Sequence, residues 1–207
     1  MANKFSDLET ANSPAGRTSP AQISVERAIG DLRRGALVIL RDAPGQTAAV
    51  VQAAEMATSM GLKMIAQITG SQPTLAITRN RAAAIKIFNQ SSNVLSLSLP
   101  QSDRSTFIHQ LSDPTFIKDP DDNNFRAPEI ERLTIIPEPL GGIAEKAIQL
   151  VKYARLLPSI VFSRLPFTEV DQLYNFKRDD GLLLVETTSI DTFANIRAQR
   201  LVKATSV

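Results

Sequence analysis

Apolar and polar positions recur along the chain with the spacing of helices and strands in turn. In segment 25–34 the apolar residues fall at i, i+3, i+4 and i+7, which predicts an amphipathic helix. Ser24 is suited to be the N-cap of this helix, and Gly35 is suited to end it. Residues 1–22 are rich in Ser, Thr, Asn, Pro and Gly and hold few apolar side chains, so we expect them to form a flexible arm.

Beyond this helix, short apolar stretches alternate with amphipathic ones, which predicts an α/β domain over residues 23–207. Strands are predicted at 36–40, 47–53, 74–78, 93–99, 133–137, 159–163 and 182–186. Helices are predicted near 59–68, 79–87, 103–112, 143–156, 168–176 and 189–200. Segment 112–130 holds three prolines and many acids and amides, which predicts a long exposed loop that divides the chain into two halves.

Composition excludes several kinds of site and partner. The 207 residues include no cysteine, which excludes disulfides, thiolate zinc sites, iron–sulfur clusters and a cysteine nucleophile. His109 is the only histidine, so one chain cannot supply a two-histidine metal site. A net charge of +2 without a basic block does not imply nucleic acid. Because no apolar run approaches about 18 residues and no signal peptide is seen, we expect a cytoplasmic protein without membrane contact.

Two features are candidate anion sites, a group of arginines and a Gly-Gly turn, and each has a simpler interpretation. Arg33, Arg34 and Arg41 flank a predicted strand and together suit a phosphate, although such arginines are more often solvated or paired. The APGQ turn at 43–46 suits a type II turn, with Pro before Gly. Gly141-Gly142 before a helix has backbone N–H groups that could donate hydrogen bonds to an anion, although a plain turn explains the pair.

Two polar features near the middle of the chain favour structural roles. Asp103-Arg104 is typical of a helix N-cap followed by a surface arginine. His109 is favoured as a structural or surface residue, because a general base needs a partner and none is identifiable.

The stretches VERAIGDLRRGALVIL and QAAEMATSMGLKMIAQITGSQPTLAIT closely resemble 3,4-dihydroxy-2-butanone 4-phosphate synthase, the lyase of riboflavin synthesis that splits ribulose 5-phosphate. The resemblance covers about 23–200, is good at Ala54-Glu55 and is weak over 100–140. It implies a single α/β domain with a mixed sheet packed with helices. It also implies a homodimer, and magnesium held by an acid-rich loop.

The family's three catalytic elements do not survive in this sequence. Its acid-rich loop corresponds here to 41–49, where Asp42 beside Arg41 is the only acid. Its G-H-T-E-A turn corresponds to 142–146, where Ile143 and Ala144 replace the metal-binding histidine and the threonine. Its strand-end glutamate corresponds to Arg164, a reversal of charge. We therefore expect no catalytic residues, no magnesium and no other cofactor; a divergent enzyme would have only Arg41, Asp42 and Arg164 to use.

A narrower resemblance is carried by ITRNRAAAI (77–85), HQLSDPT (109–115) and KYARLLPS (152–159). Similar stretches recur in the degenerate synthase domain that precedes the catalytic domain of some bacterial GTP cyclohydrolase II proteins. This resemblance implies a non-catalytic dimerising or regulatory module, with a cyclohydrolase domain as partner in cis or in trans. The three-cysteine zinc site of the cyclohydrolase is not in this sequence.

Two other functions stay open from the sequence: a divergent sugar-phosphate lyase, and a sensor that binds a flavin or a nucleotide in the vacated pocket. For the expected homodimer, the candidate contact segments are 59–68, 93–99 and 133–137.

Overall fold

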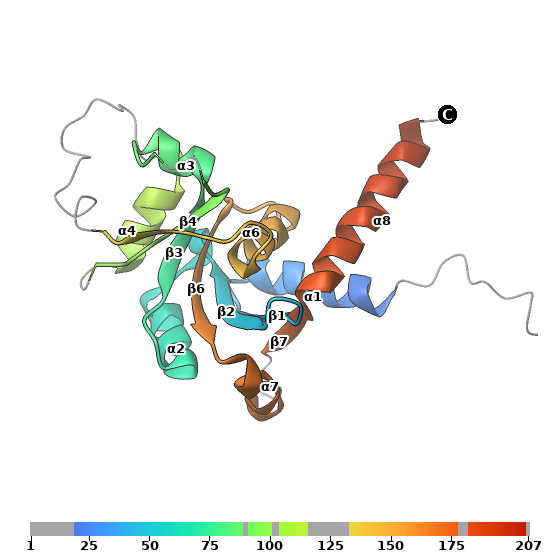
Figure 1. Cartoon of the computed structure of the whole chain (residues 1–207), viewed down its shortest axis with the longest axis horizontal. Coiled ribbons are helices and arrows are strands. Elements are labelled where there is room, and N and C mark those ends of the chain that lie inside the picture. Colours follow the sequence, from blue (N-terminus) through green and yellow to red (C-terminus); the bar gives the residue numbers. More distant parts are fainter. Residues whose placement is uncertain (1–18, 89–90, 101–103, 116–132, 178–181, 206–207) are drawn as a thin grey trace, which may run out of the picture.

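A seven-stranded mixed sheet forms the centre of the computed structural model, which describes residues 19–88, 91–100, 104–115, 133–177 and 182–205 (Figure 1). The strand order is β5-β4-β3-β6-β2-β1-β7, and only the β1–β7 pairing is parallel. The strands are β1 (Val38–Asp42), β2 (Thr47–Ala53), β3 (Thr74–Thr78), β4 (Val94–Leu97), β5 (Ile135–Pro137), β6 (Ser159–Leu165) and β7 (Leu183–Glu186). The predicted α/β class and the mixed sheet are confirmed.

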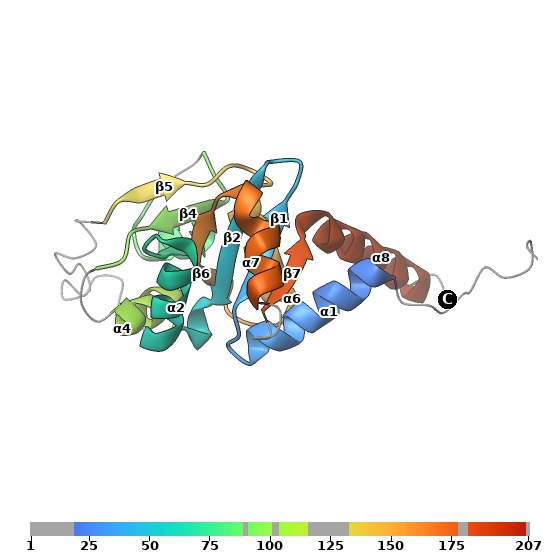
Figure 2. The same ribbon diagram turned by 90° about the horizontal axis from the view of Figure 1, so that it is seen from below.

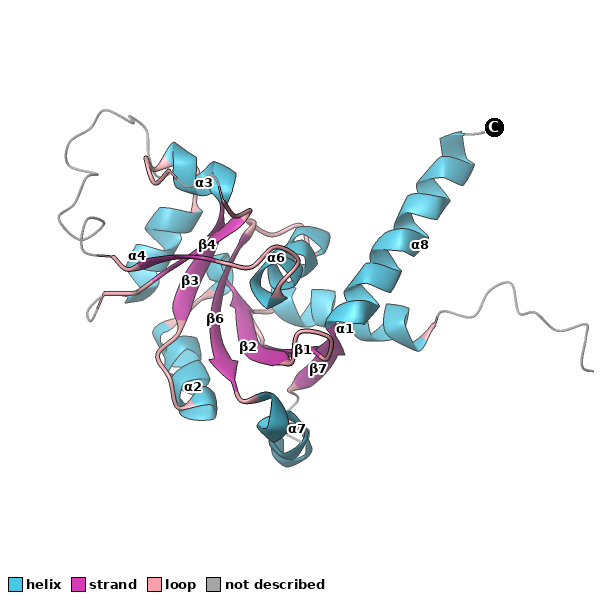
Figure 3. Ribbon diagram, in the orientation of Figure 1, coloured by secondary structure: helices cyan, strands magenta, loops and turns pink. Residues whose placement is uncertain are grey.

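Helices cover both faces of the sheet (Figure 3). They are α1 (Pro20–Arg33), α2 (Ser59–Thr69), α3 (Arg79–Ala84), α4 (Arg104–Ser112), α6 (Ile143–Tyr153), α7 (Val170–Lys177) and α8 (Thr187–Thr205), with short 3₁₀ turns at Ala54–Met56 and Phe167–Glu169. One core cluster joins the sheet to α1, α6 and α8, and α1 and α8 lie against each other (Figures 1 and 2). The other cluster joins the opposite face to α2, α3, α4 and α7.

The strands are apolar at successive positions because both of their faces are buried. In β1, Val38 and Leu40 belong to the cluster with α6, whereas Ile39 belongs to the cluster with α2. Side chains alternate between the faces of a strand, so a central strand under two helical layers needs an apolar residue at every position. This arrangement explains why the apolar runs were visible in the sequence as strands.

The sheet mixes strands from both parts of the chain. β6, which comes from the second half of the sequence, lies in the sheet between β2 and β3, which come from the first half. The predicted division of the chain into two halves at 112–130 is therefore not a division of the fold. Residues 116–130 of that predicted loop lie outside the described residues.

The first helix begins earlier than predicted. Ser19 rather than Ser24 is the N-cap of α1: the Gln22 N–H donates to Ser19 Oγ at 3.2 Å, and the Ser19 N–H donates to Gln22 Oε1 at 3.0 Å. This capping box satisfies two backbone donors at once, which outweighs the single cap that Ser24 would provide. Residues 20–22 thus belong to the helix, and residues 1–18 of the predicted arm lie outside the described residues. Gly35 ends the helix region with φ of 77°, as predicted.

Other element boundaries differ where the backbone turns left-handed. Lys86 has φ of 62° just after α3, and Arg155 has φ of 59° just after α6, so both helices end before the predicted residues 87 and 156. An α-helix cannot continue through a residue with positive φ. Toward the C-terminus α8 runs longer than predicted, to Thr205. Asp103, the predicted start of α4, lies outside the described residues.

Candidate functional site

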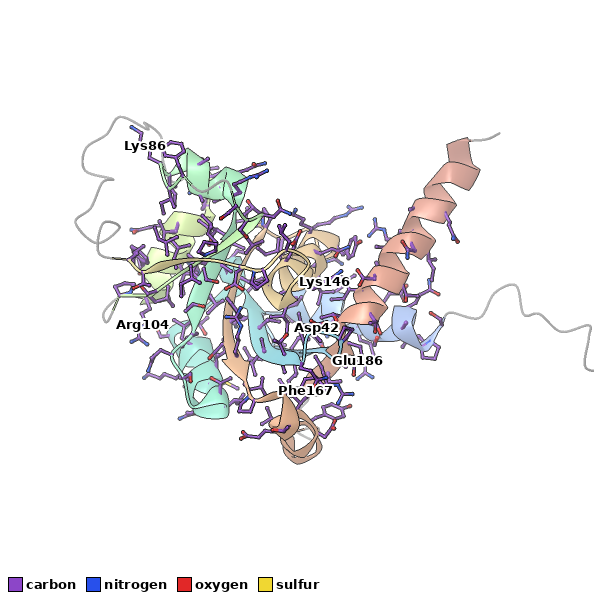
Figure 4. All side chains as sticks on the ribbon, in the orientation of Figure 1. Asp42, Lys86, Arg104, Lys146, Phe167 and Glu186 are labelled. Carbon is purple, nitrogen blue, oxygen red and sulfur yellow. The ribbon has the colours of Figure 1, made fainter. Side chains whose placement is uncertain are left out.

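Three of the residues that the resemblance assigns to the family's catalytic elements, Arg41, Asp42 and Arg164, lie at one end of the sheet. Ala49 of β2 pairs with Leu40 of β1 on one side and with Arg164 of β6 on the other. Asp42 lies two residues beyond Leu40 on the same face, so Asp42 and Arg164 share the face covered by α6. Arg41 lies on the opposite face. Figure 4 labels Asp42 and Glu186, which mark the neighbouring ends of β1 and β7.

The hairpin between β1 and β2 holds the carboxylate of Asp42 inside the turn. The Gln46 N–H donates to the carbonyl oxygen of Ala43 at 3.3 Å, and Gln46 has φ of 49°. A type II turn needs the positive φ one residue earlier, at Gly45, which lacks it, so that prediction is wrong. A Cβ on Gly45 would lie 2.2 Å from Asp42 Oδ2, which shows that the carboxylate lies over this glycine. Asp42 Oδ1 accepts a hydrogen bond of 2.6 Å from Thr187 Oγ1.

Arg41 joins two acids on the other face of the sheet. Its Nε donates to Glu186 Oε1 at 2.6 Å, and its Nη1 lies 2.5 Å from Asp171 Oδ1 of α7. The hydrogen bond to Glu186 raises the pKa of Arg41, and this effect outweighs the opposing effect of burial. The guanidinium group therefore connects β1 to β7 and α7 and is already neutralised.

Arg164 forms an ion pair with the most buried acid at this end of the sheet. Its Nη2 pairs with Glu138 Oε2, and Glu138 is only 4% exposed. The other carboxylate oxygen of Glu138 accepts from Ser96 Oγ at 2.5 Å. The Arg164 guanidinium also lies 5.1 Å from the centre of the Phe162 ring. Sequence reasoning missed Glu138; the charge reversal at Arg164 was the available signal, because an arginine here requires an acid nearby.

The first turn of α6 is closed by its own polar groups. The N–H of Gly141 donates to Glu145 Oε2 at 2.7 Å, and the N–H of Gly142 donates to the Pro139 carbonyl at 3.1 Å. An anion at Gly141 or Gly142 would have to displace these bonds, and the weak anion site predicted there stays a prediction. Ile143 and Ala144 are buried in the core, at 4% and 0% exposure.

The remaining candidates do not join this group. Arg33 Nε donates to the Ala154 carbonyl at 2.8 Å, and Arg34 pairs with Asp31 at 2.5 Å. Both precede β1, whereas Arg41 lies at its far end, so the three arginines do not form one phosphate site.

Two polar residues of α4 also have structural partners. His109 Nε2 lies 3.0 Å from the Ala57 carbonyl oxygen. Arg104 Nε donates to the Pro100 carbonyl at 2.8 Å, and Figure 4 shows Arg104 well away from Asp42.

The residues at this end of the sheet do not fit a divalent cation. One carboxylate oxygen of Asp42 already accepts a hydrogen bond from Thr187. The two carboxylate oxygens of Glu138 are engaged by Ser96 and by Arg164, and the positive charge of Arg164 would repel a cation. Magnesium needs several oxygen ligands in near-octahedral order. Within residues 19–88, 91–100, 104–115, 133–177 and 182–205, no group of three or more His, Asp or Glu is placed to hold a metal ion. In the same residues, no helix is both long and apolar enough to span a membrane.

Comparisons with known proteins give relatives in sequence and in structure, although no family model matches the chain. A GTP cyclohydrolase-2 from Azospirillum brasilense is 30% identical over 191 residues, which are 90% of this chain and 47% of the relative. The chain thus spans about half the length of the curated relative that it matches.

Two solved structures share the fold at low sequence identity. A cation-free 3,4-dihydroxy-2-butanone 4-phosphate synthase is 16% identical, with a TM-score of 0.62 over 83% of this chain and 96% of that one. Another structure of such a synthase, in complex with two magnesium ions, is 15% identical, with a TM-score of 0.60 over 85% of this chain and 97% of that one.

Proposed function

We propose that this chain, which shares the fold of 3,4-dihydroxy-2-butanone 4-phosphate synthase, serves as a non-catalytic dimerising and regulatory module of a GTP cyclohydrolase II-type protein in riboflavin synthesis. The observation that carries this proposal is the Arg164–Glu138 ion pair. Arg164 stands at the position that corresponds to the family's strand-end glutamate, and its charge is neutralised by Glu138. In the segment that corresponds to the acid-rich loop, the one acid, Asp42, has an oxygen engaged by Thr187.

Loss of the lyase chemistry is tested directly. Purified protein incubated with ribulose 5-phosphate and magnesium is expected to release no formate above a blank without protein. A general base and a metal ligand each contribute powers of ten to rate, and here both kinds of group are replaced. An authentic synthase, assayed in parallel, is the positive control. Formate release above the blank that is abolished by Asp42→Asn would instead support the divergent lyase.

The proposed homodimer is supported by apolar side chains exposed at one edge of the sheet. β5 is an edge strand, where Ile135 and Ile136 are 38% and 54% exposed, and Leu140 just beyond it is 68% exposed. An apolar edge strand favours association unless it is covered. Met60 and Met64 of α2 are also exposed. The predicted contact segment 93–99 is less suitable, because β4 is buried and is paired on both edges.

Light scattering at micromolar concentration tests the dimer. We expect twice the chain mass of 22.6 kDa, and Ile136→Lys is expected to shift the mass toward that of one chain. Ile23→Lys on α1 is the matched control, because Ile23 is 47% exposed but lies on another element. A mass of one chain at every accessible concentration would contradict the dimer.

A further inference from the structure

A pocket lies at the other end of the sheet from Arg164. Its volume is about 600 Å³. It opens where β3 ends and β6 begins: Ile77 pairs with Ser159, the first residue of β6, whereas Arg164 lies near the end of that strand. A pocket of this size accommodates a molecule of the dimensions of a nucleotide.

Three stretches that are distant in sequence meet at this pocket. Segment 77–85 contributes Arg79, segment 109–115 contributes Ser112, and segment 152–159 contributes Lys152 and Ser159. These are the same three stretches that carry the narrower resemblance to the degenerate domains of GTP cyclohydrolase II proteins. The fold therefore gathers them around one cavity, although nothing in their sequence positions requires it.

The charges that line the pocket favour an anion. The lining includes three cationic side chains, Arg79, Arg81 and Lys152, and one carboxylate, Glu145. Glu145 is already engaged, because it accepts from the Gly141 N–H and from Asn93 Nδ2. Arg79 and Lys152 are exposed, and among the described residues neither makes an ion pair.

Arg81 has a different role, as a fixed part of the wall. Its Nε donates to the Leu111 carbonyl at 2.6 Å, and its Nη2 donates to the Asp113 carbonyl at 2.8 Å. It thereby closes the C-terminal end of α4 and holds Ser112 beside the cavity. Burial lowers the pKa of Arg81, yet a guanidinium keeps its charge throughout the physiological range.

Two buried hydroxyl groups lie in the wall of the pocket. Ser112 and Ser159, both of which line it, are 3% and 1% exposed. Neither Oγ has a hydrogen-bond partner in the described part of the chain, which is unusual for a buried polar group. Both oxygens are closed off from solvent, so a ligand reaches them only when neighbouring side chains of the wall shift.

We infer that this pocket binds a small phosphorylated molecule of the size of a nucleoside monophosphate. The phosphate is held by Arg79 and Lys152, and a small shift of the pocket wall makes the Ser112 and Ser159 hydroxyls available for further hydrogen bonds. The Leu157-Pro158 wall offers apolar surface for a flat ring, and the amides of Asn80 and Asn93 suit its polar edge. Among the residues that line the pocket, Glu145 alone belongs to a segment that corresponds to a catalytic element of the family; Arg79, Lys152, Ser112 and Ser159 do not, and the site does not depend on whether the Asp42 end of the sheet is active.

Calorimetric titration of the full chain tests the site. The probes are adenosine and guanosine 5′-monophosphates, the two nucleosides without phosphate, and inorganic phosphate. We expect at least one nucleotide to bind more tightly than its nucleoside and than inorganic phosphate. Arg79→Gln and Lys152→Gln are each expected to weaken that binding about tenfold or more. Arg27→Gln and Lys63→Gln are the matched controls, because both are exposed helical cations outside the pocket, and they should leave affinity unchanged.

The outcomes separate this inference from the proposed function. No heat with either nucleotide up to millimolar concentration, equal affinity for nucleotide and nucleoside, or equal affinity for inorganic phosphate would overturn it. So would unchanged affinity in both pocket variants. Formate release in the lyase assay would overturn the proposed function but not the pocket.

The serine hydroxyls give a second readout. Ser159→Ala is expected to weaken nucleotide binding without lowering the melting temperature of the unliganded protein, because its hydroxyl has no partner in the described structure. A lower melting temperature with unchanged affinity would assign the hydroxyl to the fold and overturn its place in the site.

Discussion

The two ends of the sheet differ in whether their charged side chains have partners. At the end that carries Asp42 and Arg164, each charged group has a partner, and Glu138 is satisfied by both Ser96 and Arg164. At the end where β6 begins, Arg79 and Lys152 face a cavity, and two seryl hydroxyls lack partners among the described residues. Satisfied polar networks stabilise a fold, whereas exposed cations without an ion-pair partner beside a cavity attract anions. The first end therefore looks structural, and the second is the better candidate for recognition.

The largest effect expected at the closed end comes from breaking the Arg164–Glu138 ion pair. Arg164→Ala leaves the buried Glu138 carboxylate with only Ser96 as partner, and because the Arg164 side chain is 48% exposed, the loss should be about 2 kcal/mol in the free energy of unfolding, less than for a fully buried pair. Urea unfolding measures this loss. Arg164→Ala combined with Glu138→Gln should lose less, because the unpaired charge is gone. If the single variant is as stable as the exposed control Arg27→Ala, the pair is not structural.

A smaller effect is expected at the hairpin. Gly45→Ala places a Cβ 2.2 Å from Asp42 Oδ2, so the carboxylate must move and its bond to Thr187 is strained or lost. We expect a loss of about 1.5 kcal/mol in thermal or urea unfolding. In the Asp42→Ala background the same substitution should cost much less. Equal costs in the two backgrounds would show that the contact between Asp42 and Gly45 does not matter.

The Arg41 network should contribute still less, because it is partly exposed. Asp171 is 76% exposed in its side chain, so Asp171→Asn is expected to cost about 0.5 kcal/mol. The loss should shrink in high salt, since exposed charges are screened. Urea unfolding at low and at high salt measures both values. A loss that is large and independent of salt would show that the Arg41–Asp171 pair, like the Arg164–Glu138 pair, is shielded from solvent and contributes strongly to stability.

The smallest effect concerns pH beside the pocket. Asp113 accepts hydrogen bonds from the Thr115 N–H and Oγ1, both at 2.7 Å, and the bond from the backbone N–H is the main cause of its lowered pKa. The folded pKa lies below the unfolded one, so this stabilisation is present above the ordinary aspartate pKa of about 4 and is lost as the pH falls through the lowered value. Thermal melts of Asp113→Asn should therefore show a slightly shallower loss of stability in acid. An unchanged acid limb would contradict this role for Asp113.

The sequence by itself determined most of the elements, because their signals are local. Strand 74–78 and the extended stretch 47–53 were predicted at their observed bounds, since apolar runs between turns reflect burial on both faces. The capping box at Ser19 was also present in the sequence, as Ser followed three residues later by Gln, and was missed in favour of Ser24.

Only the tertiary structure decided which polar groups meet. Asp42 and Thr187 are 145 residues apart, and Arg164 and Glu138 are 26 residues apart on different elements, so no spacing along the chain predicts either contact. Likewise, segments 77–85, 109–115 and 152–159 were recognised one by one, but the pocket exists because β3, β6 and α4 bring them together. Local patterns follow from the periodicity of side chains along one element, whereas a site depends on how elements pack, and that is a property of the whole core.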